Sequence, residues 1–232
     1  MNHSLMSPNL NDRPKGQEID MVVVHYTGMQ TAKAALKRLC DPAAQVSAHY
    51  LIEENGDIYQ LVPNEKRAWH AGVSYWMGQN NLNDCSIGIE LVNPGHDYGY
   101  RPFEKKQMQA ALELMRCLIQ SYPIPARRIV GHSDIAPTRK IDPGELFDWA
   151  WLAQHGVGLW PSPIPLKQET KDFYNFASHA LEKIGYQIIS SDKKDLIPVI
   201  QAFQRRFRPK KVDGNLDQET ITIINGMVSL LT

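Results

Sequence analysis

Two histidines and one aspartate in this sequence are of the types that bind a catalytic metal ion. His25 lies near the end of a β-branched run (IDMVVVHYT, residues 19–27), His132 follows a second short apolar run, and Asp142 lies ten positions after His132. Catalytic zinc sites use neutral imidazoles and carboxylates and keep one coordination position open for water or substrate. Strand ends could bring these three side chains together. The spacing alone is equally compatible with two buried structural histidines and an Asp-Pro-Gly turn.

The elements that would position these residues alternate between strand-like and helical patterns. Short β-branched runs predict strands, and apolar residues spaced three and four apart predict helices. Asn55 and Gly56 between two strand-like runs predict a hairpin, because both residues tolerate positive φ. We expect strands at residues 19–27, 48–52, 57–62, 86–92 and 128–131, helices at 32–39 and 104–120, and a loop at 133–144. This order predicts an α/β domain with a mixed central β-sheet flanked by helices.

The length and composition indicate a folded chain of two domains. The 232 residues exceed the usual size of one domain, and 43% are hydrophobic against 22% charged. Lys plus Arg equals Asp plus Glu at 25 each, so the net charge gives no reason to expect nucleic-acid binding. Cys40, Cys85 and Cys117 lack a CxxC spacing, and we expect buried thiols rather than disulfides or zinc ligands.

A proline-rich segment marks the expected boundary between the domains. Pro161, Pro163 and Pro165 alternate with other residues, which predicts a stiff extended linker. Beyond it, helical patterns at residues 171–184, 196–207 and 217–231 predict a small all-α three-helix domain. The chain is therefore divided into a catalytic domain at residues 15–160, a linker at 161–170 and a helical domain at 171–232. This organisation predicts that the first domain folds alone and contains the whole active site.

Four segments of the first domain resemble the hallmark segments of the type 2 N-acetylmuramoyl-L-alanine amidases. In the family's order, they are VVVHYTG (22–28), AWHAG (68–72), SIGIELVNPG (86–95) and GHSDIAPTRKIDPG (131–144). The family includes bacterial recycling and envelope amidases, phage amidases and the related animal peptidoglycan recognition proteins. The resemblance implies the zinc amidase fold, with one zinc ion per chain held by His25, His132 and Asp142. It also implies hydrolysis of the amide between N-acetylmuramic acid, or its anhydro form, and L-alanine.

The resemblance assigns catalytic roles to two further residues. Glu90 matches the family's catalytic glutamate, and Lys140 matches the basic residue two positions before the third ligand. A carboxylate near zinc can take a proton from the attacking water and give it to the leaving amine. A positioned ammonium can stabilise the oxyanion, although a lysine in a loop is also compatible with a solvated surface charge.

Three other residues are candidates for substrate contact. Trp69 and His70 resemble the family's cleft wall, and core packing is the alternative interpretation. Arg139 suits a substrate carboxylate, and a surface charge is the alternative. We expect His49 to be a structural histidine rather than a fourth ligand.

The helical domain resembles the three-helix peptidoglycan-binding domain that is attached to many wall hydrolases. The segments that carry this resemblance are LEKIGYQI (181–188), IQAFQRRF (200–207) and VDGNLDQET (212–220). Its basic cluster is expected to be a solvated loop and not a nucleic-acid site, and consists of Arg205, Arg206, Arg208, Lys210 and Lys211. The expected partner is peptidoglycan or a soluble muropeptide, bound by a monomer.

Two rival functions and two compartments are compatible with the sequence. A non-catalytic peptidoglycan recognition module would need neither the third ligand nor Glu90, and a zinc peptidase would instead cut between amino acids of the stem peptide. Residues 1–16 lack the pattern of an export signal, and no later window is long and apolar enough to span a bilayer. The default expectation is therefore the cytoplasm, whereas a wall-binding domain favours the periplasm or cell envelope.

Overall fold

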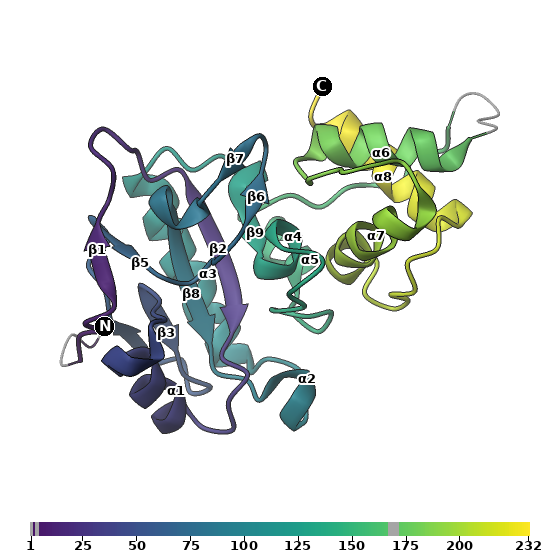
Figure 1. Cartoon of the computed structure of the whole chain (residues 1–232). Coiled ribbons are helices and arrows are strands. Elements are labelled where there is room, and N and C mark those ends of the chain that lie inside the picture. The colour runs from purple at the N-terminus through teal and green to yellow at the C-terminus, as the bar shows by residue number, and fades with distance from the viewer. Residues whose placement is uncertain (1, 3–4, 167–171) are drawn as a thin grey trace.

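The first domain is built on a five-stranded mixed β-sheet (Figure 1). The structure, a computed structural model, describes residues 2, 5–166 and 172–232. All neighbouring strands of the sheet are parallel except β3 and β4, which form the predicted antiparallel hairpin. The strand order is β4 (Ile58–Gln60), β3 (Tyr50–Ile52), β8 (Ser86–Leu91), β2 (Met21–Tyr26) and β9 (Ile129–Gly131). The predicted mixed central sheet is confirmed.

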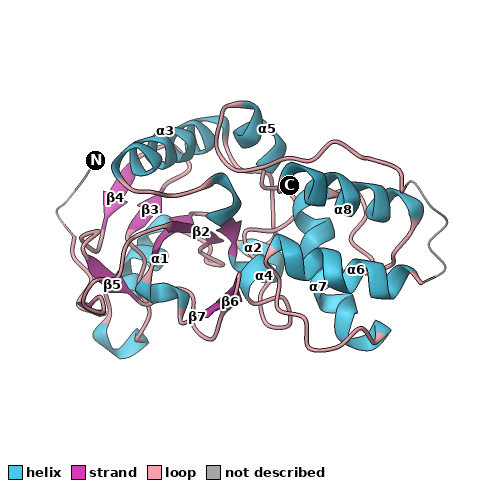
Figure 2. Cartoon of the chain, turned by 90° about the horizontal axis from the view of Figure 1, so that it is seen from above, coloured by secondary structure: helices cyan, strands magenta, loops and turns pink. Residues whose placement is uncertain are grey.

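Helix α3 (Lys105–Ser121) covers one face of this sheet. Alternate residues of β2 and β8 are buried against it, among them Val22, Val24, Ile87 and Ile89. Helix α5 (Trp149–Gln154) belongs to the same core and lies beside α3 when the chain is seen from above (Figure 2). Because side chains alternate along a strand, residues 21, 23 and 25 of β2 point to the opposite face. His25 therefore lies on the face that α3 leaves uncovered.

Shorter elements surround that second face. Helix α1 (Ala32–Leu39) begins at Thr31, whose hydroxyl accepts a hydrogen bond from the backbone N–H of Ala34 at 3.1 Å. Two small antiparallel ladders pair β1 (Leu10–Asp12) with β5 (Lys66–Ala68) and β6 (Tyr75–Trp76) with β7 (Gln79–Asn80). The other short elements are α2 (Gly95–Tyr98), α4 (His132–Ile135) and 3₁₀ turns at Pro42–Ala44, Leu82–Asp84 and Ala126–Arg128.

Three helices follow the proline segment and lie together beside the first domain. They are α6 (Phe173–Ile184), α7 (Lys193–Phe207) and α8 (Gln218–Leu230). The carboxylate of Asp217 accepts the backbone N–H of Thr220 at 3.0 Å and so caps the N-terminus of α8. The domain boundary itself stays a prediction, and its residues 167–171 lie outside the described residues. Within the part of the chain that is described, no helix has both the length and the apolar character that a membrane span needs.

Two local expectations differ from the structure. The predicted loop at 133–144 begins inside the one-turn helix α4, which forms because the carboxylate of Asp134 accepts the backbone N–H of Gly131 at 2.8 Å. A single helical turn is too short to show a hydrophobic period, so the sequence pattern could not predict it. Among the cysteines only Cys85 is buried, and Cys117 is exposed on α3. The buried-thiol prediction is therefore wrong for Cys117.

The predicted solvated basic loop is wrong for two of its residues. Arg206 and Arg208 are each only 5% exposed. Arg208 forms ion pairs with Asp217 at 2.5 Å and with Glu219 at 2.6 Å, both in the helical unit. Burial of an arginine requires such partners, and the sequence alone did not identify them.

Candidate metal centre and active site

The predicted metal ligands converge because adjacent parallel strands end at the same edge of the sheet. His25 is the penultimate residue of β2, and His132 begins α4 directly after β9, the neighbour of β2. Glu90 of β8 lies directly opposite His25 in the strand register. Paired residues of neighbouring strands share a face, so Glu90 and His25 point into the same space.

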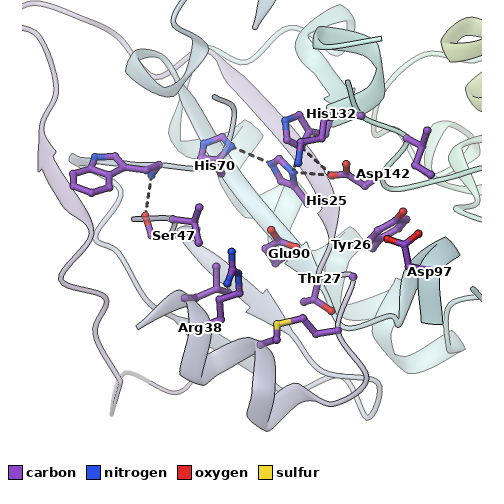
Figure 3. Close-up of a pocket in the computed structure, with 18 of the residues that line it drawn as sticks. His25, Tyr26, Thr27, Arg38, Ser47, His70, Glu90, Asp97, His132 and Asp142 are labelled. Carbon is purple, nitrogen blue, oxygen red and sulfur yellow. Dashed lines mark hydrogen bonds and ion pairs between the residues drawn. The ribbon is translucent and has the colours of Figure 1, made fainter. Parts of the chain in front are cut away.

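His25, His132 and Asp142 bring three donor atoms together (Figure 3). The Nδ1 atoms of the two histidines lie 2.9 Å apart, and each lies 3.0 Å from Oδ2 of Asp142. The three residues are 2%, 3% and 7% exposed. Two imidazole nitrogens and a carboxylate oxygen at this spacing form a candidate metal site.

Hydrogen bonds at the far nitrogens orient both imidazole rings. Nε2 of His132 lies 3.1 Å from the carbonyl oxygen of Ala71, which can only accept, so Nε2 carries the proton. Nε2 of His25 lies 3.1 Å from Nδ1 of His70, whose own Nε2 lies 3.2 Å from the hydroxyl oxygen of Ser86. This chain is satisfied when His25 donates to His70 and His70 donates to Ser86. By this assignment both metal-ligand candidates present an unprotonated Nδ1 to the centre.

The electrostatics of His25 and Asp142 favour the protonation states that metal binding requires. Burial and, second to it, the nearby charge of His132 together lower the pKa of His25 to about 4. Burial raises the pKa of Asp142, but the charges and hydrogen bonds of the two histidines outweigh this effect and hold the pKa well below its usual range. At neutral pH, His25 is therefore a neutral imidazole and Asp142 an ionised carboxylate.

Glu90 faces the same pocket with an unsatisfied oxygen. Its Oε2 is buried and has no hydrogen-bond partner among the described residues. Burial raises the pKa of Glu90 well above its usual range, the charge of Asp142 adds to this, and the charge of Lys140 opposes it. A buried carboxylate oxygen without a protein partner is suited to hold water or a ligand. The position of Glu90 therefore fits a general base beside the metal site.

All the residues predicted for catalysis, metal binding and substrate contact line one pocket of about 480 Å³. Nη2 of Arg139 donates to the carbonyl oxygens of Ala71 and Val73 at 2.9 and 2.8 Å, so Arg139 also holds the group that orients His132. Trp69 donates its indole N–H to the side chain of Asn11 at 2.6 Å. Trp69 is partly exposed and lines the pocket, so its contact with substrate stays a prediction.

Sequence reasoning missed other parts of the pocket. Arg38, Ser47 and Asp97 also line it and belong to no quoted motif. Arg38 comes from α1, Ser47 from the loop before β3 and Asp97 from α2, and only the fold brings these elements together. His49, by contrast, is structural as expected, because it is fully buried and its Nδ1 accepts the backbone N–H of Gly88 at 3.0 Å.

A mixed sheet that brings two histidines, an aspartate and a facing glutamate into one pocket is an arrangement typical of metal-dependent hydrolases. A family model described as N-acetylmuramoyl-L-alanine amidase matches residues 15–145. The amidase AmiD of Escherichia coli is 39% identical over an alignment of 239 positions, which covers 90% of this chain and 82% of that protein. The chain belongs to the N-acetylmuramoyl-L-alanine amidase family.

Two solved structures share the fold over nearly the whole chain. AmiD of E. coli, in complex with its substrate anhydro-N-acetylmuramic acid-L-Ala-D-γ-Glu-L-Lys, matches with a TM-score of 0.80 and 34% identity, covering 99% of this chain and 93% of that one. AmpDh3 of Pseudomonas aeruginosa matches with a TM-score of 0.82 and 34% identity, covering 95% of each chain. Because these matches extend far beyond residue 145, the C-terminal helices belong to the shared architecture.

Proposed function

We propose that this chain is a zinc-dependent amidase that hydrolyses the bond between the lactyl group of N-acetylmuramic acid, or its anhydro form, and L-alanine of the stem peptide. The observation that carries this proposal is the convergence of two imidazole nitrogens and a carboxylate oxygen beside the unsatisfied oxygen of Glu90. A pure recognition module would need neither the complete ligand set nor a buried carboxylate facing it.

The donor set fits one zinc ion per chain. Zinc binds imidazole nitrogen and carboxylate oxygen at about 2.0–2.2 Å, and ligand atoms of a tetrahedral site then lie about 3.4 Å apart. The observed separations of 2.9 and 3.0 Å are close to this spacing. Three protein ligands leave a fourth position open, which is typical of catalytic zinc. When bound, zinc would supply a Lewis acid that polarises the scissile carbonyl and acidifies water.

Glu90 is the proposed general base and then general acid. Its carboxylate takes a proton from the attacking water and returns it to the nitrogen of L-alanine as the C–N bond breaks. Burial raises the pKa of Glu90, which favours its role as a proton donor, whereas a bound cation would lower the pKa and favour its role as a base.

Lys140 is the proposed stabiliser of the oxyanion that develops on the scissile carbonyl. It lines the pocket, and its charge opposes the rise in the pKa of Glu90, which supports a position within electrostatic reach of the reacting groups. Trp69, His70 and Arg139 are the proposed substrate contacts from the pocket wall. Since His70 and Arg139 also orient the two histidine ligands, their replacement is expected to affect metal binding as well as substrate binding.

The proposed substrates are muropeptides and peptidoglycan. The complex of AmiD with an anhydro-muramyl tripeptide supports the soluble class, because that protein shares the fold of this chain over almost its full length. We assign peptidoglycan binding to the helical domain at residues 171–232, and we expect the protein to be a monomer. A tethered binding module raises the effective concentration of a catalytic site at an insoluble polymer.

Incubation with intact sacculi and with anhydro-muropeptides, followed by mass analysis of the products, tests this function. An amidase releases intact stem peptides and a sugar with a free lactyl carboxylate. A zinc peptidase would shorten the stem peptide, and a recognition module would release nothing. Either of these outcomes from a zinc-loaded protein would refute the proposal.

A further inference from the structure

The C-terminal helices share a core with the domain that carries the metal centre. Residues of β9 and of the segment after it, on either side of His132, are buried in one apolar cluster with residues of α6 and α7. The cluster includes Val130, Ile135, Ala136, Leu181, Ile200 and Phe203. The backbone N–H of Met77 donates to the carbonyl of Gly185 at 2.8 Å. The ring of Trp76 meets that of Tyr186 edge-on, with centroids 4.9 Å apart. These contacts hold the helices against the first domain.

The described part of the proline segment is also fixed to the helical unit. The backbone N–H of Ile164 donates to the carbonyl of Thr222 at 2.9 Å, and the side chain of Asn225 donates to the carbonyl of Ile164 at 3.0 Å. Gly226 has no room for a side chain, because a Cβ there would collide with the carbonyl oxygen of Ser162. Residues 162–166 therefore pack on α8 instead of acting as a free spacer.

Asp134 forms buried polar contacts between the two parts of the chain. It lies in α4, two residues after His132, and is 1% exposed. Its Oδ1 accepts the hydroxyl of Tyr186 at 2.6 Å, and its Oδ2 accepts Nη1 of Arg206 at 2.9 Å. Oδ2 also accepts the backbone N–H of Gly131. One buried carboxylate thus joins α7 and the segment after α6 to the turn that precedes His132.

Arg206 makes further contacts that fix its guanidinium. Its Nη2 donates to the carbonyl of Ile129 at 2.8 Å, at the beginning of β9. The guanidinium carbon lies 4.3 Å from the ring centroid of Trp149. A buried guanidinium is tolerated only where it is paired, so Arg206 and Asp134 depend on each other.

The turn formed by α4 contacts the backbone beside both His132 and Asp142. The N–H bonded by Asp134 belongs to Gly131, the residue immediately before His132. The backbone N–H of Ser133 donates to the carbonyl oxygen of Asp142 at 2.9 Å. The placement of α4 therefore sets the positions of His132 and Asp142 relative to His25.

We infer that Arg206 and Tyr186 are positioning residues for the metal centre: through Asp134 they hold the turn that presents His132. The helical unit is then a structural component of the metal site. Loss of either partner leaves a buried carboxylate incompletely paired and loosens the turn. Outer partners of metal ligands typically contribute about 10–100-fold to metal affinity. This inference rests on the metal centre of the proposed function.

Zinc affinity of the full chain tests the inference directly. Tyr186→Phe removes only the hydroxyl, and Arg206→Met removes the guanidinium but keeps most of the aliphatic stem. Competition with a chromogenic chelator should show zinc binding about 10-fold weaker in Tyr186→Phe and up to about 100-fold weaker in Arg206→Met. Arg206→Lys keeps the positive charge but cannot make both contacts of the guanidinium, so its zinc affinity should lie between those of Arg206→Met and the wild type. The visible spectrum of the cobalt-substituted variants should also change, because it depends on ligand geometry.

Arg208→Met is the matched control. Arg208 is as buried as Arg206, but its ion pairs stay within the helical unit. This variant should unfold at a lower temperature while its zinc affinity and cobalt spectrum stay those of the wild type. Equal loss of zinc affinity in both arginine variants would overturn the inference, because general destabilisation would explain it. Wild-type zinc affinity in both Arg206→Met and Tyr186→Phe would also overturn the inference. If Arg206→Met does not fold, the zinc affinity of Tyr186→Phe alone decides the test. Absence of zinc from the wild-type chain would instead refute the proposed function.

Discussion

Gly88 is the position where one added methyl group should disturb the metal centre without touching a metal ligand. It lies in β8, two residues before Glu90 and on the same face, and the ring of His70 lies directly over it. A Cβ built at Gly88 would lie 2.6 Å from Cδ2 and 2.8 Å from Nδ1 of His70, and closer still to Cγ. Carbon atoms pack at about 3.5–4.0 Å, so Gly88→Ala displaces the imidazole by roughly 1 Å.

The expected size of the effect follows from what His70 does. Its Nδ1 lies 3.1 Å from Nε2 of His25, and this contact fixes the tautomer and ring orientation of a metal ligand. A displacement of that size bends or breaks the hydrogen bond. Since such outer partners contribute about 10–100-fold to metal affinity, Gly88→Ala should weaken zinc binding by about 1.4–2.8 kcal/mol.

A double-mutant cycle isolates the cause. Zinc dissociation constants are measured for the wild type, Gly88→Ala, His70→Ala and the double variant. In the His70→Ala background the added methyl group occupies vacated space, so Gly88→Ala should change the affinity little. A full penalty from Gly88→Ala in that background would refute the reasoning, because the damage would then come from the strand itself. Unchanged affinity in the single variant would refute it equally.

Four further predictions concern catalysis, metal binding, acid stability and the helical unit. Glu90→Gln should keep zinc but lower the turnover number about 10²–10⁴-fold, because an amide cannot accept the proton of water; near-normal turnover would exclude Glu90. His132→Ala should lose zinc by elemental analysis, whereas Lys140→Ala should slow turnover and retain zinc. Burial, aided by the charge of Arg13, lowers the pKa of His49 to about 3, so the unfolded chain binds this proton more readily. The contribution of neutral His49 to the free energy of unfolding is therefore fully present above pH 6.5 and is lost as the pH falls towards about 3. In denaturant titrations, His49→Gln should make the free energy of unfolding depend less on pH in this range. A chain ending near Ser162 should bind zinc more weakly and unfold at a lower temperature by calorimetry, in contrast to the independent folding that the proline segment predicts; parent-like values would show that the shared core is dispensable.

The candidate site was largely predictable because its residues lie in contiguous motifs at the ends of recognisable strands. The β-branched run before His25 predicted β2, and the turn after residue 92 predicted where β8 ends. The sequence could not give the hydrogen bonds that orient the ligands. His70 was expected to contact substrate, and its ring nitrogen Nδ1 also lies against His25, which is 45 positions away in the sequence. Contacts of this kind depend on strand register and loop closure, which no local pattern specifies.

The long helices and the central strands were predicted because each has a clear period or a β-branched run. Short elements such as α4 and the ladders of two or three residues were not, since they depend on single side-chain caps and tertiary pairing. The linker illustrates a different limit. Alternating prolines predict a stiff extended segment, but they do not reveal that its described part packs on α8 at Gly226.

Arg206 shows which signal could have revealed the contact between the helical unit and the metal centre. It lies three residues after Phe203 and seven after Val199, so it falls on the buried stripe of α7 and not on its solvent face. A charged residue on an apolar stripe requires a buried partner of opposite charge, and this requirement is visible in the sequence. The identity of the partner is not visible in the sequence, because Asp134 lies 72 positions earlier, inside a motif that predicts metal binding. The charge at residue 206 is therefore better explained by the fold of the first domain than by peptidoglycan recognition, and basic residues of this unit that remain exposed, such as Lys210, are the ones left for contact with polymer.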